Sequence, residues 1–246
     1  MRFISTALHQ TRVDGVLQRK YLLPGVFDFG LLDGARINKT LERLAITPDG
    51  RCAWLAMEAA LRQDGDEPTM AAVGGPCRFA QINLTSGQMV RQTAYEPDAI
   101  ANAPSPPSAN ADNGVVEISM LDAHRLLVLE CACMAGLNDA LRNLIWLYMI
   151  DSCHGLNILH TAALKAGNHT PAAKRRVADF ANYPLLARVD NTEGMCWGPT
   201  LPNGNGNGNG NGNGNGNGTL VFVSDDNFNH WQIIQFLAFE CQESTP

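Results

Sequence analysis

The chain has 246 residues, of which 45% are hydrophobic and 17% charged, and its formal net charge is −6. These values are typical of a single globular domain, and an acidic chain without a basic stripe excludes the usual nucleic-acid-binding classes. The longest apolar stretch, around Leu141–Ile150, is too short to cross a membrane. The only dense cationic run, Lys174–Arg176, is interpreted as a solvated loop.

The N-terminus does not continue as a secretion signal. Met1–Ser5 begins like a signal peptide, but His9 and Arg12 follow before an apolar segment forms. We therefore expect no signal peptide in this chain, and the compartment stays open on this evidence.

An internal repeat is the most informative feature of the sequence. Three segments share one order: an acidic residue, an apolar strand, a turn, a second strand that ends in another acid, and a third strand after a variable insert. The leading acids Glu42, Glu117 and Glu193 lie 75 and 76 positions apart. Short β-rich segments between turn residues predict an all-β fold, and their repetition predicts the blades of a β-propeller.

The predicted elements follow the repeat in chain order. The first copy predicts strands at Leu44–Ile46, Cys52–Met57 and Phe79–Leu84, with a turn at Pro48–Gly50. The second copy predicts strands at Ile118–Leu121, Arg125–Leu129 and Ile145–Ile150. The third copy predicts strands at Gly194–Trp197, Thr219–Val223 and Ile233–Phe239.

Four further segments have a distinct character. A helix is an alternative for Leu137–Met149, although its isoleucine and aromatic content favours a strand, and Ala162–Ala181 is expected to be a helix or an irregular insert. Ala101–Asn113, rich in Pro, Ala and Asn, is expected to be a flexible surface loop. Asn203–Gly218 consists of eight Asn-Gly pairs and is expected to be an expanded hairpin loop without regular structure.

Five ordered segments resemble motifs of the phytase-like family known by the description "esterase-like activity of phytase". They are Leu41–Arg51 (LERLAITPDGR), Met57–Gly65 (MEAALRQDG), Glu117–Glu130 (EISMLDAHRLLVLE), Asp190–Pro199 (DNTEGMCWGP) and Ser224–Asn229 (SDDNFN) with Gln235–Phe239. The resemblance implies one domain over residues 1–246. It would be a partial β-propeller of about three to four antiparallel blades with long loop insertions, lacking N-terminal blades.

Two positions depart from the family pattern beside motif acids. Position 43 is Arg where the family usually has Gly, and position 131 is Cys where Arg or Lys is common. Both departures bear on any activity shared with the family.

The resemblance implies Ca²⁺-assisted hydrolysis of a phosphate ester or a carboxylic ester. A ring of carboxylates suits Ca²⁺, which can bind phosphate or activate water. The expected ligands are Glu42, Glu58, Glu117, Glu130, Glu193, Asp225 and Asp226, and the catalytic candidates among them are Glu42, Glu193 and Asp226. We expect at least four of these acids to face one cavity. The alternative is that they accept backbone N–H bonds at turns and hold neighbouring blades together.

Two other functions stay open, because one fold hosts many activities. The chain is then a non-catalytic binding propeller or an inactive truncated member of the family. A small-molecule ester or phosphate ligand is the expected partner, and open blade edges predict self-association. The resemblance also favours an exported protein.

Overall fold

The computed structural model of the chain describes residues 5–136, 141–186, 188–199 and 218–241. Within these ranges the chain forms four antiparallel sheets, none of them closed, and its helices are short 3₁₀ turns. The predicted all-β fold is therefore confirmed. No helix in these ranges is long and apolar enough to cross a membrane.

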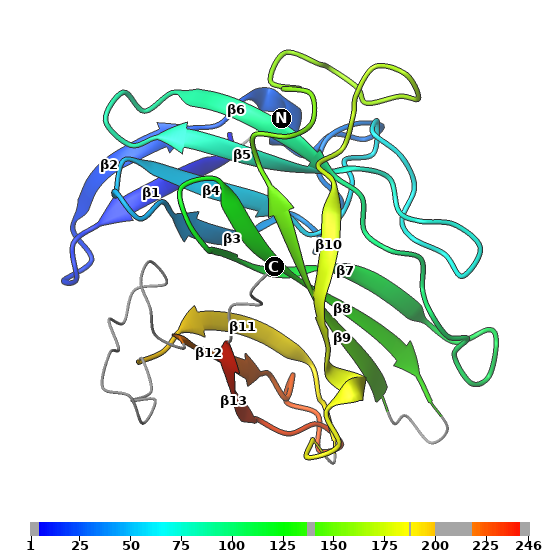
Figure 1. Cartoon of the computed structure of the whole chain (residues 1–246). Coiled ribbons are helices and arrows are strands. Elements are labelled where there is room, and N and C mark those ends of the chain that lie inside the picture. Colours follow the sequence, from blue (N-terminus) through cyan, green and yellow to red (C-terminus); the bar gives the residue numbers. More distant parts are fainter. Residues whose placement is uncertain (1–4, 137–140, 187, 200–217, 242–246) are drawn as a thin grey trace.

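The chain begins with an N-terminal hairpin and a first sheet whose strands pair in chain order (Figure 1). The hairpin consists of β1 (Ala7–Thr11) and β2 (Leu17–Leu22), and the 3₁₀ turn η1 (Gly25–Phe27) follows it. The first sheet consists of β3 (Leu41–Ile46), β4 (Cys52–Met57), β5 (Cys77–Asn83) and β6 (Met89–Tyr95).

Two further sheets repeat this up-and-down order. The second sheet consists of β7 (Ala111–Met120), β8 (Arg125–Ala135), β9 (Leu141–Asp151) and β10 (Lys174–Asp179). The 3₁₀ turn η3 (Phe180–Asn182) leads to the third sheet, which consists of β11 (Thr192–Trp197), β12 (Gly218–Ser224) and β13 (Phe236–Cys241).

Most predicted strands are found, and four observed strands, β1, β2, β6 and β10, were not predicted. β9 confirms the strand prediction against the helical alternative, whereas β6 has no predicted counterpart. β10 lies inside Ala162–Ala181, so the prediction of a helix or irregular insert is wrong over Lys174–Asp179. The same strand corrects the solvated loop predicted for Lys174–Arg176, because pairing with β9 places these residues in a sheet.

The two low-complexity segments have different outcomes. Residues 101–110 are irregular, but β7 already begins at Ala111, so the last three residues of the predicted loop are in a strand. Almost all of Asn203–Gly218 lies outside the described residues, and its prediction stays a prediction. Gly218 is the first residue of β12.

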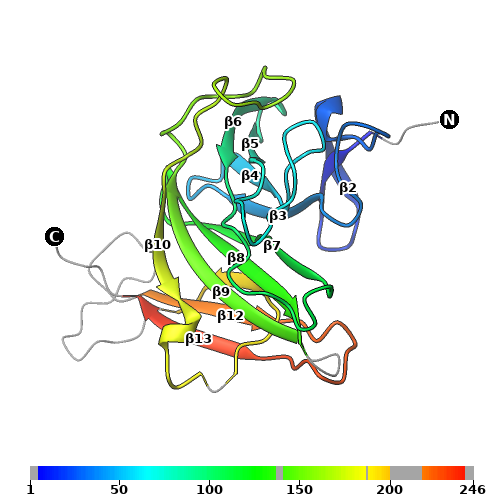
Figure 2. The ribbon, with the colours of Figure 1, turned by 90° about the vertical axis from the view of Figure 1, so that its right-hand side faces the viewer.

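The three sheets meet along their first strands. β3 contacts β7, and β7 contacts β11, so that the sheets lie as successive layers (Figure 2). One apolar core, which includes Trp54, Phe79 and Tyr148, joins the first and second sheets. A second core, which includes Phe180 and Phe222, joins the second and third sheets. The first strands thus form the common line along which side chains from different sheets approach one another.

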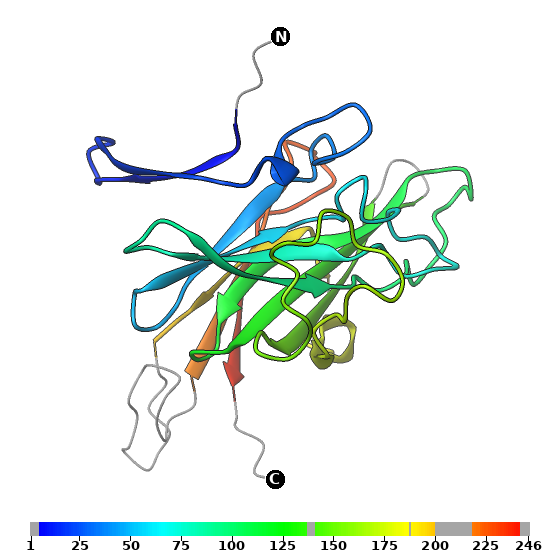
Figure 3. The same ribbon diagram turned by 90° about the horizontal axis from the view of Figure 1, so that it is seen from above.

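The N-terminal hairpin lies beside the first sheet (Figure 3). The Nη1 atom of Arg19 donates to the carbonyl oxygens of Leu84 and Thr85 at 2.7 and 2.9 Å, and the Tyr21 hydroxyl donates to the Leu84 oxygen at 3.2 Å. These bonds attach β2 to the turn between β5 and β6.

The insertion between β9 and β10 lies against β6, the outer strand of the first sheet. The amide of Ile158 donates to the Gln92 oxygen at 3.0 Å, and the amide of Ala172 donates to the Ala94 oxygen at 2.9 Å. The insertion between two strands of the second sheet therefore takes the hydrogen-bonding role of a neighbour to β6, the last strand of the first sheet.

A buried ion pair anchors the same insertion. The Arg78 guanidinium donates to both oxygens of Asp64, at 2.6 and 2.9 Å, and these side chains are 1% and 0% exposed. Asp64 Oδ1 also accepts the amide of Leu164 at 2.8 Å. Asp64 therefore joins the first sheet to the insertion through one carboxylate.

We predict that Asp64→Ala lowers the free energy of unfolding by about 3–5 kcal/mol, because it leaves the Arg78 charge buried without its partner. Urea unfolding followed by circular dichroism measures the change. The matched control is Asp14→Ala, which breaks the half-exposed pair of Arg12 and Asp14 and should cost less than about 1 kcal/mol. Equal losses in the two variants would contradict the prediction.

Candidate active site

A β-bulge recurs near the start of each first strand. The pairing register shifts between Leu41 and Arg43 in β3, and between Thr192 and Gly194 in β11. The extra residues at these two bulges are Glu42 and Glu193. A bulge rotates the local chain and changes the direction of its side chains. Glu42 and Glu193 therefore hold equivalent positions, at which neither residue is paired with one on the neighbouring strand.

The third leading acid does not occupy the equivalent position. In β7 the register shifts between Val115 and Glu117, so the extra residue is Val116. Glu117 therefore aligns with Arg43 of β3 and Gly194 of β11, one position beyond the bulge. The repeat spacing predicted three equivalent glutamates, and the strand pairing corrects this to two.

Glu42 and Glu58 form a carboxyl pair between the first and second sheets. Glu58 follows β4, its amide donates to the Thr40 oxygen at 3.0 Å, and its carbonyl oxygen accepts the amide of Val115 at 3.1 Å. Its carboxyl group is in hydrogen-bond contact with that of Glu42. Burial, and then the charge of Glu42, raises the pKa of Glu58 to about 8. At neutral pH, Glu58 therefore holds a proton and donates it toward Glu42.

Gly114 of β7 permits this close approach. A Cβ atom added to Gly114 would lie 3.0 Å from Glu58 Cγ and 3.3 Å from Glu58 Oε1. A side chain at this position would displace the Glu58 carboxyl group. The absence of a Cβ atom on β7 is thus part of what positions Glu58.

Lys39 lies on another side of the carboxyl pair. Its Nζ atom contacts Asp112 and lies 2.6 Å from Glu67 Oε1. Burial alone would lower the pKa of Lys39, but the hydrogen bonds to Asp112 and Glu67 outweigh it and raise that pKa. The same ammonium charge acts on Glu58 and opposes the rise of its pKa.

Arg43 lies between Glu42 and Glu117. Its Nη2 atom is 3.6 Å from Glu42 Oε2, and its charge acts on Glu117. Burial raises the pKa of Glu117, while the amides of Ile118 and Met195 and the charge of Arg43 oppose that rise. The Nε atom of Arg43 is buried and has no hydrogen-bond partner among the described residues.

Glu193 belongs to the same neighbourhood through Cys131. The side-chain amide of Asn191 donates to Glu193 Oε1 at 2.6 Å, and the Cys131 thiol contacts Asn191 Oδ1 at 3.7 Å. Burial raises the pKa of Cys131, and nearby charges that include Glu193, Asp112 and Glu58 raise it further. The departure at position 131 therefore places a neutral thiol, not a cation, among these acids.

Glu130 is held in a closed network away from these acids. Its carboxylate accepts the Tyr95 hydroxyl, the Asp98 amide at 3.0 Å, the Asn113 side-chain amide at 2.8 Å and Lys174 Nζ at 2.8 Å. The side chain is 0% exposed. This arrangement matches the alternative in which a repeated acid holds neighbouring sheets together.

Asp225 and Asp226 stabilise the turn after β12. Asp225 Oδ1 accepts the amide of Asn227 at 3.1 Å, and Asp226 Oδ1 accepts the amide of Phe228 at 3.0 Å. Asn227 and Phe228 have positive φ angles of 48° and 54°, so side-chain caps are needed there. These two aspartates therefore have local structural partners.

The structure brings together several predicted residues and adds others that sequence reasoning missed. Glu42 contacts Glu58, while Glu117 and Glu193 lie on β7 and β11, the first strands of the other two sheets. That at least four of the predicted acids face one cavity stays a prediction. Lys39, Asp112 and Gly114 were not predicted, because Asp112 lies in the segment read as a loop and no motif marks Lys39 or Gly114. We name Lys39, Glu42, Arg43, Glu58, Glu67, Asp112 and Glu117 the carboxylate cluster.

The calcium site expected from the sequence stays a prediction. Within the described ranges, no group of three or more His, Cys, Asp or Glu side chains is arranged to hold a metal ion. The oxygens that approach one another contact the carboxyl proton of Glu58, the ammonium group of Lys39 or the guanidinium group of Arg43. This donor set does not fit Ca²⁺, which takes six to eight oxygen ligands.

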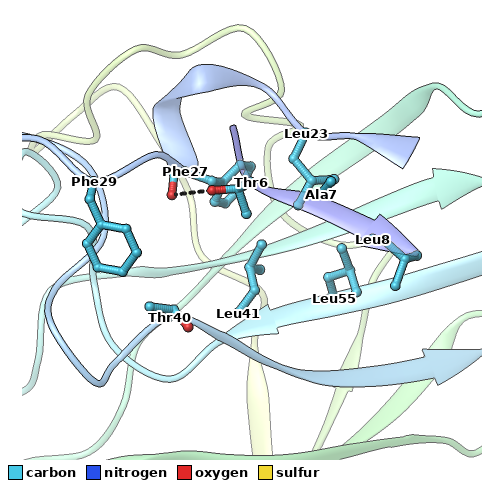
Figure 4. Close-up of a pocket in the computed structure, with 9 residues that line it drawn as sticks. All are labelled: Thr6, Ala7, Leu8, Leu23, Phe27, Phe29, Thr40, Leu41 and Leu55. Carbon is cyan, nitrogen blue, oxygen red and sulfur yellow. Dashed lines mark hydrogen bonds between the residues drawn. The ribbon is translucent and has the colours of Figure 1, made fainter. Parts of the chain in front are cut away.

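An apolar cavity of about 170 Å³ lies on the other side of the first sheet, toward β1 and η1 (Figure 4). Its lining is Thr6, Ala7, Leu8, Leu23, Phe27, Phe29, Thr40, Leu41 and Leu55. The Thr6 hydroxyl donates to the Phe27 carbonyl oxygen at 3.1 Å beside it. No lining residue is ionisable, so this cavity offers contact area and no acid–base group.

Comparison with known proteins gives one match. A family model described as "Phytase-like: Esterase-like activity of phytase" matches residues 5–228. No curated protein and no solved structure matches the chain.

We predict that Glu58 makes stability fall with rising pH. Its folded pKa is about 8 against an ordinary value of 4.5, so the folded state binds the extra proton between these values, and stability declines as pH rises through that window. Glu58→Gln should remove this decline, so that at about pH 8.5 its free energy of unfolding exceeds that of the wild type. Urea unfolding at several pH values measures it, with Asp14→Asn as control. Parallel wild-type and Glu58→Gln profiles would show the prediction to be wrong.

We also predict that Gly114→Ala lowers the free energy of unfolding by about 1–2 kcal/mol, because the new Cβ atom displaces Glu58. Thermal unfolding measures the loss. The control is Gly25→Ala, whose Cβ atom would meet its nearest neighbour at an ordinary 3.6 Å and should change stability little. An unchanged Gly114→Ala variant would mean that Glu58 has room to move.

Proposed function

Because the chain belongs to the phytase-like family, described by esterase-like activity of phytase, we propose that it hydrolyses a carboxylic ester or a phosphate ester at the Glu42–Glu58 pair. The observation that carries this proposal is the contact of the two carboxyl groups, with a pKa of about 8 at Glu58. A carboxylic acid that is protonated at neutral pH, next to a second carboxyl group, is a common arrangement for acid–base catalysis.

The partial propeller remains part of this proposal. Three successive meanders with adjacent first strands support it. In a propeller the first strand of each blade lies nearest the axis, so the carboxylate cluster would open at one end of a central channel.

The pair supplies a base and an acid at neighbouring oxygens. The Glu42 carboxylate accepts a proton from water, and the water oxygen attacks the carbonyl carbon or the phosphorus of the ester. Glu58 then donates its proton to the leaving oxygen as the ester bond breaks. The protons balance, because Glu42 ends protonated and Glu58 ends ionised, and one proton transfer between the touching groups restores the starting state.

The cations of the cluster would stabilise negative charge that develops on the substrate. The Arg43 Nε atom is a buried donor without a partner among the described residues, and Lys39 is held close by Asp112 and Glu67. Fixed positive groups near a developing oxyanion lower the barrier of ester hydrolysis.

We predict that the chain hydrolyses 4-nitrophenyl acetate or 4-nitrophenyl phosphate, and that Glu58→Gln and Glu42→Gln each lower kcat by about 10²-fold or more. Release of 4-nitrophenol, measured with and without Ca²⁺, tests this. Asp14→Asn removes a remote carboxylate and should leave the rate unchanged. Wild-type rates equal to the uncatalysed rate on both substrates would refute the proposed activity.

A second candidate is binding without catalysis, and exposed apolar side chains at the end of the third sheet favour it. Ile234 and Phe236 are 62% and 76% exposed, and Trp231 is also exposed. Exposed apolar side chains grouped in this way support association with another molecule, including a further copy of the chain. Light scattering after size-exclusion chromatography would reveal self-association as a mass above 26.6 kDa.

A further inference from the structure

The carboxylate cluster contains its own cations. Lys39 contacts Asp112 and Glu67, and Arg36 Nη1 lies 3.7 Å from Glu67 Oε2. Lys39 is 17% exposed and Arg36 is 16% exposed at the side chain, so their charges act with little screening by water.

Arg43, in β3, is the second cation of the carboxylate cluster itself, and β3 contacts β7. Its side chain is 17% exposed, it contacts Glu42 at 3.6 Å, and its charge reaches Glu117 on the neighbouring first strand. Arg43, Glu117 and Gly194 hold equivalent register positions on β3, β7 and β11. The position that carries a guanidinium group in β3 therefore carries a carboxyl group in β7 and no side chain in β11.

Within the carboxylate cluster, two cations, Lys39 and Arg43, lie among five acidic side chains, of which Glu58 holds a proton. Each carboxylate has a compensating group: Lys39 serves Asp112 and Glu67, Arg43 serves Glu42, and Glu58 holds a proton. Glu117 accepts backbone amides as well as the field of Arg43.

We propose that Arg43 and Lys39 are built-in counter-ions that take the place of a divalent cation, so that the carboxylate cluster neither binds nor requires Ca²⁺. This inference does not depend on whether the cluster hydrolyses esters. A divalent cation would have to displace both side chains to reach enough oxygen ligands, because Ca²⁺ takes six to eight of them. Removal of one built-in charge should instead leave carboxylate oxygens that attract a cation.

The experiment is thermal unfolding of the full chain in CaCl₂ and in EDTA, with Arg43→Gln as the test variant. The wild-type melting temperature should be the same in both. In Arg43→Gln it should rise by roughly 5–10 °C at a Ca²⁺ concentration about 100 times the dissociation constant. Adding Glu42→Gln to this variant should abolish the rise, because it removes an oxygen ligand and its charge.

Arg51→Gln is the matched control. Arg51 is 80% exposed in the β3–β4 turn, where it pairs weakly with Asp49, so its removal changes net charge equally without touching the cluster. Its melting temperature should be the same in CaCl₂ and in EDTA. Lys39→Gln is the second test variant, should Arg43→Gln fail to fold, and it should gain the same Ca²⁺ response.

Two results would overturn the proposal. The first is a wild-type melting temperature that rises with Ca²⁺ and falls with EDTA. The second is that neither Arg43→Gln nor Lys39→Gln gains a response to Ca²⁺. Because the readout is a melting temperature, loss of the proposed hydrolase activity would leave this test unaffected.

Discussion

The buried Glu130 carboxylate is the contact on which the rest of the structure depends. Its partners come from three strands and one loop: Tyr95 ends β6, Asn113 lies in β7, Lys174 begins β10, and Asp98 precedes β7. A buried charge that loses such partners costs several kcal/mol. The first and second sheets must therefore meet at one relative position, and that position brings Gly114, the neighbour of Asn113, against Glu58.

The repeated acids of this chain have different tasks, and their partners decide which. Glu130 is surrounded by hydrogen-bond donors from both sheets, so its carboxyl group is fully occupied by the protein and its role is structural. Glu58 has a carboxylate and a glycine beside it, so it is the acid that keeps a proton. Asp225 and Asp226 are turn caps. Residue type and spacing suggest one ring of equivalent acids. The hydrogen bonds show instead that some acids form the carboxylate cluster, that Glu130 joins two sheets, and that Asp225 and Asp226 cap a turn.

Local sequence explains much of the fold. Runs of apolar residues beside turn residues predict β4 at its observed bounds and β8 from its observed start, although β8 extends six residues beyond the predicted end at Leu129. The strand predicted at Ile145–Ile150 lies within β9. These are properties of short segments, and they do not depend on distant partners. The repeat singles out Glu42 and Glu58 among seven candidate acids, and their mutual contact is a finding of the structure.

What the sequence did not predict depends on long-range pairing. Lys174 looks like part of a solvated cationic run, because its partner Glu130 lies 44 positions away. The one-residue offset of Glu117 is invisible locally, since a bulge is defined by the opposite strand, β8. Lys39 and Asp112, which are 73 positions apart, become neighbours only when β3 and β7 meet.

The insertion between β9 and β10 has a consequence for the behaviour of the chain at high concentration. β6 would otherwise be an outer strand whose unpaired amide and carbonyl groups could template pairing with another molecule. Ile158, Asn157 and Ala172 occupy those groups at Gln92 and Ala94. Proteolytic cleavage within 152–173 would release this cover together with Ile158 and Leu164, which are buried with Ala94. The exposed edge of β6 would then be open to pairing with another molecule.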